Sequence, residues 1–414
     1  MPKLLQINVT ANWGSTGKIA EQINQAAQLR GWDIYFAYGR NMIPAQSVLI
    51  HTGNLFQVYE HYAEHRLFDN DGLASRMATL RLINRIKRLK PNIIHLHNIH
   101  DHWLNYRLLF NFLNTVDIPI VWTQHDCWSF TGGCAHFTLK KCYQWRDGGC
   151  KQGCPMRKEM IMRRLFEKTS VHYALKKQLF THTKNLTLVT ASRWLENIEK
   201  ESFLSNHNIV TIHNGINTST FQPVDSTEVR KKYGIGKSRY VIGVSSVWLP
   251  YKGLYDFMQL PPMLPEGVKL VLVGLSREQM NMAQIKGIVG VERTDNILEL
   301  AALYSGALMF LNLTYEDNYP TTNLEAMACG VPVLTYNTGG SSEALSVDTG
   351  WVVEQGDLSS VAAIVRDLVE RECVCPSEVM EMRQRCRKRA ENEFDKNDRF
   401  SEYIKLYDDL LEGK

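Results

Sequence analysis

The sequence predicts an α/β fold made of two domains, each built on a parallel β-sheet. Short apolar runs alternate with amphipathic helical patterns along the whole chain, which is typical of parallel strands joined by right-handed crossovers. The pattern loosens once, in the turn-rich stretch 205–222, and then restarts. A length of 414 residues also favours two cores over one.

The elements follow in order along the chain. In the first half we expect strands at 4–9, 34–38, 93–97, 118–123 and 186–190, with helices over 18–29 and 80–89. In the second half we expect strands at 240–245, 269–273, 308–313 and 331–336, with helices over 252–260, 296–304 and 321–329. We therefore place an N-terminal domain at 1–205 and a second domain at 206–395. A last helical segment, 396–414, has no sheet of its own and is free to pack anywhere, including back on the N-terminal domain.

Composition and charge exclude several classes of protein. The chain is 44% hydrophobic and 22% charged, which is ordinary for a soluble globular protein, and its net charge of +4 is too mild to indicate a nucleic-acid partner. It has no stretch of about 18 apolar residues that could span a membrane. The N-terminus resembles a first strand rather than a signal peptide, and nine cysteines without an export signal favour reduced thiols or a metal site. We expect a cytoplasmic protein.

The segment from Glu316 to Gly330 predicts a phosphate-binding helix start. Pro320 can open a helix at its first turn, and the amides that follow it at Thr321, Thr322 and Asn323 would point toward an anion. The hydroxyls of the two threonines add donors. Asp317 and Glu325 lie on either side of this helix start and suit hydrogen bonds from sugar hydroxyls. The alternative is an ordinary capped helix with solvated acids.

A second loop follows the strand at 240–245, and it contains Ser246 and Lys252. A lysine at the carboxyl end of a parallel strand supplies a mobile point charge for a diphosphate. The alternative is a solvated lysine.

Together these two segments resemble the donor-binding half of the family-4 retaining glycosyltransferases, which have the GT-B fold: two Rossmann-like domains whose parallel sheets face a cleft. The family's acid pair, Glu followed by seven residues and Glu, corresponds here to Asp317 and Glu325, with Glu316 as a competing candidate one residue out of register. The resemblance implies that the first acid contacts the donor sugar and the second holds the ribose. Lys252 corresponds to the family's diphosphate lysine.

The same resemblance identifies further candidates. The family's diphosphate arginine is Val247 here, so this contact is missing or is supplied elsewhere, for example by Arg277. Arg293 and Thr294 lie in a stretch similar to the loop that holds the nucleotide base. Tyr319 belongs to an Asp-Asn-Tyr-Pro turn similar to that of bacterial family members from capsule, exopolysaccharide and O-antigen pathways.

In the N-terminal domain, Gly14, Thr16 and Gly17 form a glycine loop after the first strand. It is neither a dinucleotide fingerprint nor a Walker loop, which disfavours an NAD enzyme or an ATPase. The resemblance implies a loop that lies under the donor diphosphate and borders the acceptor. The alternative is a plain strand-to-helix turn.

His125 follows the strand at 118–123 and is the candidate for the family's histidine, which touches the donor sugar. Asp126 is expected to orient it or to bind the acceptor, and Trp128 is expected on the acceptor side. A structural histidine is the alternative. The cluster His95, His97, His100 and His102 fits no known metal helix and stays unassigned.

A cysteine-rich insert at 127–155 follows His125 and is expected to form a wall on the acceptor side. Four of its cysteines, in the order Cys-x7-Cys-x7-Cys-x3-Cys, suit a structural zinc site, with two disulfides or free thiols as alternatives: Cys134, Cys142, Cys150 and Cys154. The family resemblance implies that no catalytic metal is needed.

Residues 76–90 carry six basic side chains and no acid, with leucine and isoleucine at helical spacing. Such a helix either sits on anionic lipid or presents a solvated basic face.

The resemblance implies transfer of a sugar, with retention, from a UDP or GDP sugar to a hydroxyl of a saccharide acceptor. A polyprenyl-diphosphate-linked saccharide in surface polysaccharide synthesis suits the basic helix, which would hold the protein on the inner face of the cell membrane. Two alternatives remain open: a sugar-nucleotide epimerase of the same fold, and a non-catalytic sugar-nucleotide-binding subunit. The second is suggested by Val247 and by the shorter acid Asp317.

Overall fold

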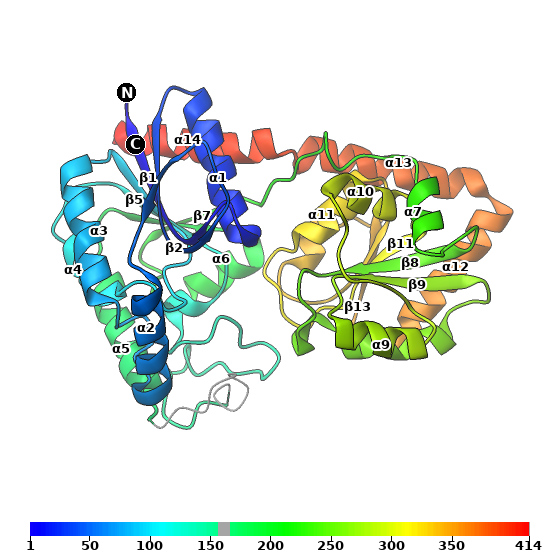
Figure 1. Cartoon of the computed structure of the whole chain (residues 1–414), viewed down its shortest axis with the longest axis horizontal. Helices are drawn as coiled ribbons and strands as arrows, with labels where there is room; N and C mark the ends of the chain where they lie inside the picture. Colours follow the sequence, from blue (N-terminus) through cyan, green and yellow to red (C-terminus); the bar gives the residue numbers. More distant parts are fainter. Residues whose placement is uncertain (156–165, 414) are drawn as a thin grey trace. The chain divides into compact units, whose positions relative to one another are not determined.

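A computed structural model describes residues 1–155 and 166–413. The chain forms two compact units, unit 1 from Met1–His213 with Arg399–Lys414 and unit 2 from Asn214–Asp398. The first division lies later than the boundary expected at 205/206, because the strand Asn208–Thr211 still pairs with the sheet of unit 1. The parallel sheets expected for both halves are confirmed, and each is enclosed by helices (Figure 1).

Unit 1 contains a seven-stranded sheet of order β3-β2-β1-β4-β5-β6-β7 whose neighbouring strands are parallel. Its strands are β1 (Lys3–Ala11), β2 (Asp33–Met42), β3 (Val48–His51), β4 (Ile93–Leu96), β5 (Ile120–Gln124), β6 (Leu186–Thr190) and β7 (Asn208–Thr211). Its helices are α1 (Gly14–Leu29), α2 (Leu55–Phe68), α3 (Arg76–Leu89), α4 (Tyr106–Leu113), α5 (Thr169–Phe180), α6 (Arg193–Lys200) and the 3-10 turn η1 (Trp128–Phe130).

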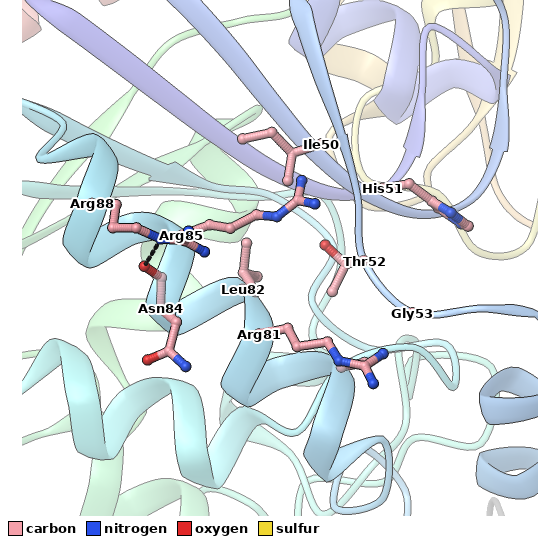
Figure 2. A pocket seen from close by; sticks show the side chains of 10 residues that line it. Ile50, His51, Thr52, Gly53, Arg81, Leu82, Asn84, Arg85 and Arg88 are labelled. Carbon is pink, nitrogen blue, oxygen red and sulfur yellow. Dashed lines mark hydrogen bonds between the residues drawn. The ribbon is translucent and has the colours of Figure 1, made fainter.

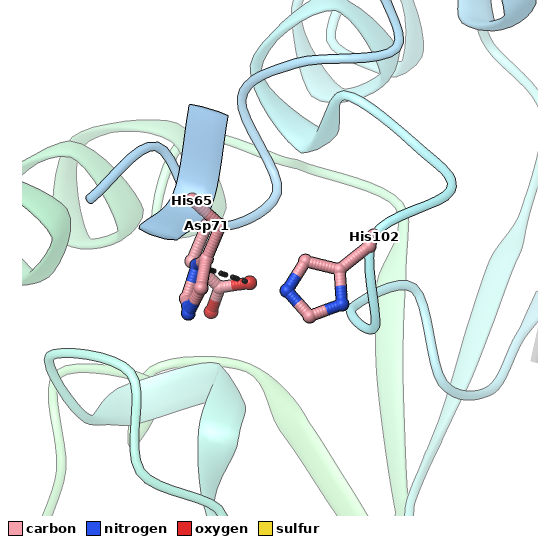
Figure 3. Close-up of side chains that lie close together, drawn as sticks. All are labelled: His65, Asp71 and His102. Atoms are coloured by element: carbon pink, nitrogen blue, oxygen red, sulfur yellow. Dashed lines mark ion pairs between the residues drawn. The ribbon is translucent and has the colours of Figure 1, made fainter. Parts of the chain in front are cut away.

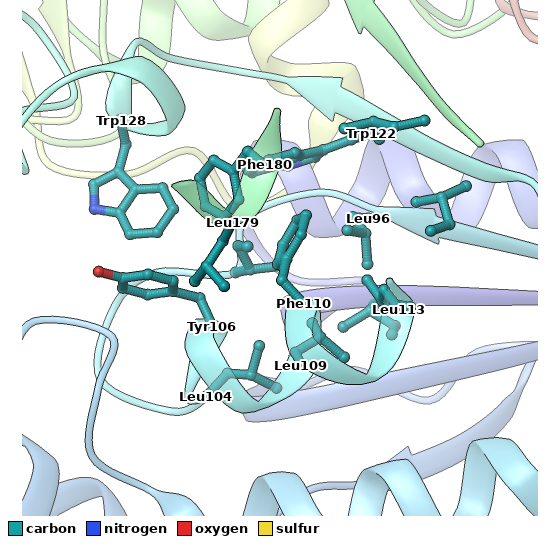
Figure 4. Packing of buried hydrophobic residues seen from close by; sticks show 14 of the residues in the cluster. Leu96, Leu104, Tyr106, Leu109, Phe110, Leu113, Trp122, Trp128, Leu179 and Phe180 are labelled. Carbon is teal, nitrogen blue, oxygen red and sulfur yellow. The ribbon is translucent and has the colours of Figure 1, made fainter. Parts of the chain in front are cut away.

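Aromatic side chains fill the core of unit 1 between the sheet and α4 and α5 (Figure 4). The rings of Phe110 and Phe180 lie 4.3 Å apart between centroids, and Trp122 meets Phe180 edge-on at 5.1 Å. Such pairs add about 0.5–1.5 kcal/mol each beyond the burial of their area. This packing fixes the end of β5 and therefore the position of His125, which follows it.

The last helix, α14 (Lys396–Leu411), packs on unit 1 and is drawn in red in Figure 1. Its Tyr407 hydroxyl lies 2.6 Å from Nδ1 of His95, and Thr123 donates to the Tyr403 hydroxyl at 3.3 Å. These bonds join α14 to the neighbouring strands β4 and β5.

Unit 2 contains a six-stranded parallel sheet of order β10-β9-β8-β11-β12-β13. Its strands are β8 (Arg239–Val244), β9 (Val268–Val273), β10 (Val289–Val291), β11 (Met309–Asn312), β12 (Val333–Tyr336) and β13 (Gly350–Val353). Its helices are α7 (Thr227–Lys232), α8 (Leu254–Gln259), α9 (Arg277–Ile285), α10 (Ile297–Ser305), α11 (Thr321–Ala328), α12 (Leu358–Val374) and α13 (Pro376–Glu393), with 3-10 turns η3 (Pro250–Lys252), η4 (Pro261–Met263) and η5 (Ser341–Ala344).

Strands β3, β7, β10 and β13 were not expected from the sequence, because each has only three or four residues and is too short for a clear alternating pattern. In the described ranges, no helix combines the length and the apolar character that crossing a bilayer would require.

Candidate functional site

Two loops at the carboxyl edge of the sheet in unit 2 are tied together. They follow β8 and β11, which are neighbours in the sheet. The carbonyl of Tyr251 accepts a hydrogen bond from the amide of Tyr315 at 2.7 Å and another from the Thr314 hydroxyl at 3.2 Å. Side chains that are 65 residues apart in sequence therefore meet at one edge of the sheet.

Lys252 and Asp317 meet at this junction, with Nζ 2.6 Å from Oδ2. The two side chains are 27% and 22% exposed, so a ligand can reach both. Glu316, the competing acid, is buried. The acid that faces the lysine is thus the one in register with Glu325.

Two glycines allow these loops to approach so closely. A Cβ on Gly253, at φ +77°, would lie 1.9 Å from the carbonyl oxygen of Leu313. A Cβ on Gly339, at φ +52°, would lie 1.9 Å from the carbonyl oxygen of Asp317. Each position combines a left-handed backbone with a contact that only glycine tolerates.

Helix α11 begins at Thr321, four residues after Asp317. Pro320 is its N-cap residue rather than its first helical residue, with φ −69° and ψ 116°, and no side chain caps the helix. The amide of Asn323 donates to the carbonyl of Pro320 at 3.2 Å. In the described part of the chain, the amides of Thr321 and Thr322 have no acceptor, so the two amides and the helix dipole are available to an anion.

Asn323 and Glu325 are held within unit 2. The Asn323 side chain is fully buried, accepts a hydrogen bond from Asn312 at 2.8 Å and donates to the carbonyl of Ser341 at 3.0 Å. The side chain therefore positions the helix start, and the contact of the Asn323 backbone amide with a phosphate stays a prediction. The half-buried Glu325 accepts a hydrogen bond from the Tyr304 hydroxyl at 3.1 Å.

The remaining candidates of unit 2 also lie at the carboxyl ends of strands. Ser246 is exposed in the loop after β8, and Arg293 and Thr294 follow β10. Tyr319 is buried. The Arg277 guanidinium is almost fully exposed and lies 3.8 Å from the Glu292 carboxylate.

In unit 1, a chain of hydrogen bonds fixes the proton on His125. The Gln6 side-chain amide donates to the carbonyl of Ala20 at 2.9 Å, so its oxygen faces Nε2 of His97, 2.5 Å away, and that nitrogen carries a proton. Burial lowers the pKa of His97 well below its usual value, so the ring is neutral and its Nδ1 accepts. His125 Nε2, 3.1 Å from that nitrogen, must therefore be the donor.

Burial also lowers the pKa of His125 to about 4, so this ring is neutral at neutral pH. Asp126 binds His100 at 3.0 Å. Burial alone would lower the pKa of His100, but the carboxylates of Asp126 and Asp101 hold it well above its usual value. Burial acts to raise the pKa of Asp126, yet His100 lowers it to about 2, so the two form an ion pair.

The glycine loop of unit 1 is part of the start of α1. A Cβ on Gly17 would lie 2.7 Å from the Thr10 hydroxyl, so this glycine lets α1 pack against the end of β1. Gly14 has φ +68° and open space around it. The Thr16 hydroxyl lies 3.5 Å from the Asn8 side-chain nitrogen.

Trp128 is only 3% exposed, so it offers a ligand little surface. Its indole N–H donates to Asp71 at 3.2 Å, and Lys176 Nζ lies 3.4 Å from the centre of its ring. Burial lowers the pKa of Lys176 to about 7. The sequence did not indicate this buried network, because Asp71, Trp128 and Lys176 lie far apart in the chain.

His65, Asp71 and His102 gather beside this network, with ligand atoms all within 4.8 Å of one another (Figure 3). His65 Nδ1 lies 3.6 Å from the Asp71 carboxylate. Two imidazoles and one carboxylate are a ligand set that zinc or iron accepts. His102 was left unassigned from the sequence, and His65 and Asp71 gave no signal there.

The four cysteines expected to bind zinc are free thiols. Those described form no group of three ligand atoms within 4.8 Å, and three of them belong to the aromatic core of unit 1: Cys134, Cys142 and Cys150. Burial raises the pKa of Cys134 to about 12 and that of Cys150 to about 11. The structural zinc site therefore stays a prediction, with free buried thiols as its alternative.

Comparison with known proteins gives two family matches. Residues 20–220 match the model described as "Glycosyltransferase Family 4", and residues 225–393 match "Glycosyl transferases group 1". The putative colanic acid biosynthesis glycosyl transferase WcaC of Escherichia coli (strain K12) is 27% identical over 98% of this chain and all of its own length. The capsular polysaccharide biosynthesis glycosyltransferase CapM of Staphylococcus aureus is 26% identical over 51% of this chain and 60% of its own.

A third relative is the N,N'-diacetylbacillosaminyl-diphospho-undecaprenol alpha-1,3-N-acetylgalactosaminyltransferase of Campylobacter jejuni subsp. jejuni serotype O:2, which is 25% identical over 48% of this chain and 54% of its own. Among solved structures, sucrose-phosphate synthase from Thermosynechococcus elongatus superposes with a TM-score of 0.72 over 100% of both chains at 16% identity. Anabaena Alr3699/HepE in complex with UDP superposes with a TM-score of 0.68 over 98% of this chain and 99% of its own at 13% identity.

These likenesses agree with the fold of both units. The two family models together cover most of the chain, and the matched structures share its pair of parallel-sheet domains. The chain belongs to the family-4 glycosyltransferases, enzymes that use a nucleotide-sugar donor, and it has their GT-B fold.

Proposed function

We propose that this enzyme transfers a sugar, with retention of configuration, from a nucleoside diphosphate to a hydroxyl of a lipid-linked saccharide in surface polysaccharide synthesis. The observation that carries the proposal is the contact of Lys252 with Asp317, four residues before the uncapped start of α11. This edge of the sheet offers a cation and two amides without acceptors, which suit a diphosphate, and an acid, which suits the hydroxyls of an attached sugar.

The residues of unit 2 act on the leaving group. As the glycosidic bond breaks, negative charge grows on the diphosphate, and Lys252 with the amides of Thr321 and Thr322 stabilises it without large rearrangement. A phosphate that engages Lys252 releases the Asp317 carboxylate to accept a hydrogen bond from the donor sugar. Glu325 is proposed to hold the ribose, as its position in the family pattern implies.

In unit 1, His125 is proposed to contact the donor sugar as a neutral ring. Its proton lies on Nε2 through the bonds to His97 and Gln6, so His97 fixes both its orientation and its tautomer. Asp126, paired with His100, is proposed to face the acceptor.

The relatives support the choice of substrates. The name of the Campylobacter enzyme specifies a diphospho-undecaprenol acceptor, and two other names specify colanic acid and capsular polysaccharide. The Anabaena structure holds UDP. We propose UDP or GDP as the donor base and a position on the inner face of the cell membrane, where a polyprenyl-diphosphate-linked saccharide is found.

Incubation with a panel of UDP and GDP sugars tests the proposal. Slow release of free nucleotide together with free sugar of the donor's anomeric configuration supports a retaining transferase. An epimerised nucleotide sugar would identify an epimerase instead. Binding of the nucleotide sugar without turnover, even with lipid-linked acceptors present, would identify a non-catalytic subunit.

A further inference from the structure

A basic pocket of about 380 Å³ lies in unit 1, and its lining contains none of the residues assigned to the donor site or to the His125 network (Figure 2). It is formed by the end of β3, the residues that follow it and one face of α3. Three arginines of α3 line it at spacings of four and three residues, so they share one face of the helix: Arg81, Arg85 and Arg88.

The charge of these arginines is not neutralised within the described part of the chain. None of the three lies in an ion pair there, and α3 contains no acidic residue. The only hydrogen bond among their guanidinium groups runs from Arg88 to the carbonyl of Asn84, at 3.3 Å, in the described residues. The negative end of the α3 dipole, about half a charge, is outweighed by three full positive charges.

Thr52 gives a second, independent indication of a ligand. The residue lines the pocket and is only 5% exposed, yet its hydroxyl has no hydrogen-bond partner in the described structure. Figure 2 shows this oxygen on the side of the Arg85 guanidinium. A buried hydroxyl without a partner destabilises the fold, so a polar ligand that pairs with it would be bound more tightly for that reason.

The chemistry of the lining selects the ligand. Guanidinium groups bind phosphate oxygens in pairs of parallel hydrogen bonds, and a hydroxyl donor beside them completes a phosphate site. Two exposed apolar side chains follow the lining residue Gly53 in sequence, at the start of α2: Leu55 and Phe56, which are 75% and 76% exposed. In a ligand with a phosphate joined to an apolar chain, the phosphate would bind the arginines and the chain would contact the exposed apolar side chains.

We propose that this pocket binds the phosphate or diphosphate group of a phosphorylated acceptor. The inference rests on the proposed transferase function, because it assigns to unit 1 the charged part of the second substrate. It leaves the donor diphosphate to Lys252 and α11 in unit 2. The phosphate can belong to a prenyl lipid or to a soluble sugar phosphate, and the two sources are separated by the probes below.

The test is calorimetric titration of the whole chain with inorganic pyrophosphate and, in detergent micelles, with farnesyl diphosphate. UDP or GDP is kept saturating so that the donor site is filled. Arg81→Ala, Arg85→Ala and Arg88→Ala should each weaken binding about tenfold or more, and Thr52→Val should weaken it severalfold. Lys87→Ala, which removes the same charge from α3 outside the pocket, should change it less than about twofold.

Tighter binding of farnesyl diphosphate than of pyrophosphate would assign a lipid-linked acceptor, and equal binding a soluble one. The inference is overturned if neither probe binds, or if Lys87→Ala weakens binding as much as Arg85→Ala. Donor hydrolysis is measured in parallel on the same proteins. If the unsubstituted enzyme does not hydrolyse the donor, the transferase proposal is contradicted. If it hydrolyses the donor but the arginine substitutions do not weaken probe binding, only the present inference is contradicted.

Discussion

Replacing Lys252 with alanine should abolish most of the catalysis and little of the stability. Two unit charges 2.6 Å apart attract by about 1.6 kcal/mol in water and about 6 kcal/mol at an effective dielectric constant of 20. Both side chains are about a quarter exposed, however, and pairs of that kind contribute about 1 kcal/mol or less to folding. The melting temperature should therefore fall by about 2–4 °C at most.

The effect on the reaction is expected to be larger. Removing one preformed donor from a site of developing negative charge costs about 3–4 kcal/mol, which is roughly a 100- to 1,000-fold loss of rate. The assay is release of nucleotide from the donor sugar that the enzyme hydrolyses fastest, with and without acceptor. The rate of the substituted enzyme should fall in both cases, because the leaving group is the same.

Arg239→Ala is the matched control. Arg239 also belongs to unit 2 and forms an ion pair with Glu372 at 2.5 Å, but it is the first residue of β8, at the opposite end of that strand from the Lys252 loop. Its loss should leave the rate within about twofold of the original. If Lys252→Ala keeps more than a tenth of the activity, or loses it only in step with its melting temperature, the assignment of the leaving-group site is wrong.

Three further predictions concern the loops, the histidine and the cysteines. Gly253→Ala should reduce donor hydrolysis more than tenfold, because its Cβ would lie 1.9 Å from the Leu313 carbonyl oxygen. The control is Gly234→Ala, which is also at positive φ but has open space around it and should affect only stability. Equal hydrolysis rates in the two variants would contradict the packing argument. Because folding lowers the pKa of His125 to about 4, its contribution to stability is present above the unfolded pKa near 6.5 and is lost as the pH falls toward 4. Chemical denaturation between pH 7 and 4.5 should therefore show a smaller loss of stability for His125→Asn than for the original, and the exposed His182→Asn should behave like the original. Metal analysis of the purified enzyme tests the zinc prediction, and less than one zinc per two chains would leave the four cysteines as free thiols. Zinc that persists in His102→Ala would belong to the cysteines rather than to the group of His65, Asp71 and His102.

The sequence predicted the residues of unit 2 better than their contacts. Lys252 and Asp317 were identified because both follow apolar strands, and carboxyl ends of neighbouring parallel strands share one edge. Their contact depended on β8 lying next to β11, an order that the sequence does not contain. Asn323 was assigned to the ligand through its backbone amide, and the sequence did not indicate that its buried side chain links β11 to η5.

In unit 1 the sequence indicated where the candidate residues lie, but not which side chains they contact. His125 was located from the end of β5, but the residues that set its proton, His97 and Gln6, lie on β4 and β1 and meet it only in the folded sheet. Asp126 was expected to orient His125 or to bind the acceptor, and the sequence did not indicate its ion pair with His100. Periodicity reports which face of an element is apolar, and it carries no information on contacts between distant elements.

The return of α14 to the first sheet affects how the protein forms during synthesis. Phe400, Tyr403, Ile404 and Tyr407 complete the core of unit 1, and burying four such side chains contributes about 6–12 kcal/mol as an upper estimate. That is comparable to the whole stability of a typical domain. The half of the protein that leaves the ribosome first therefore cannot reach its final stability until the last helix has been translated, so unit 2 has the opportunity to fold before unit 1 is complete.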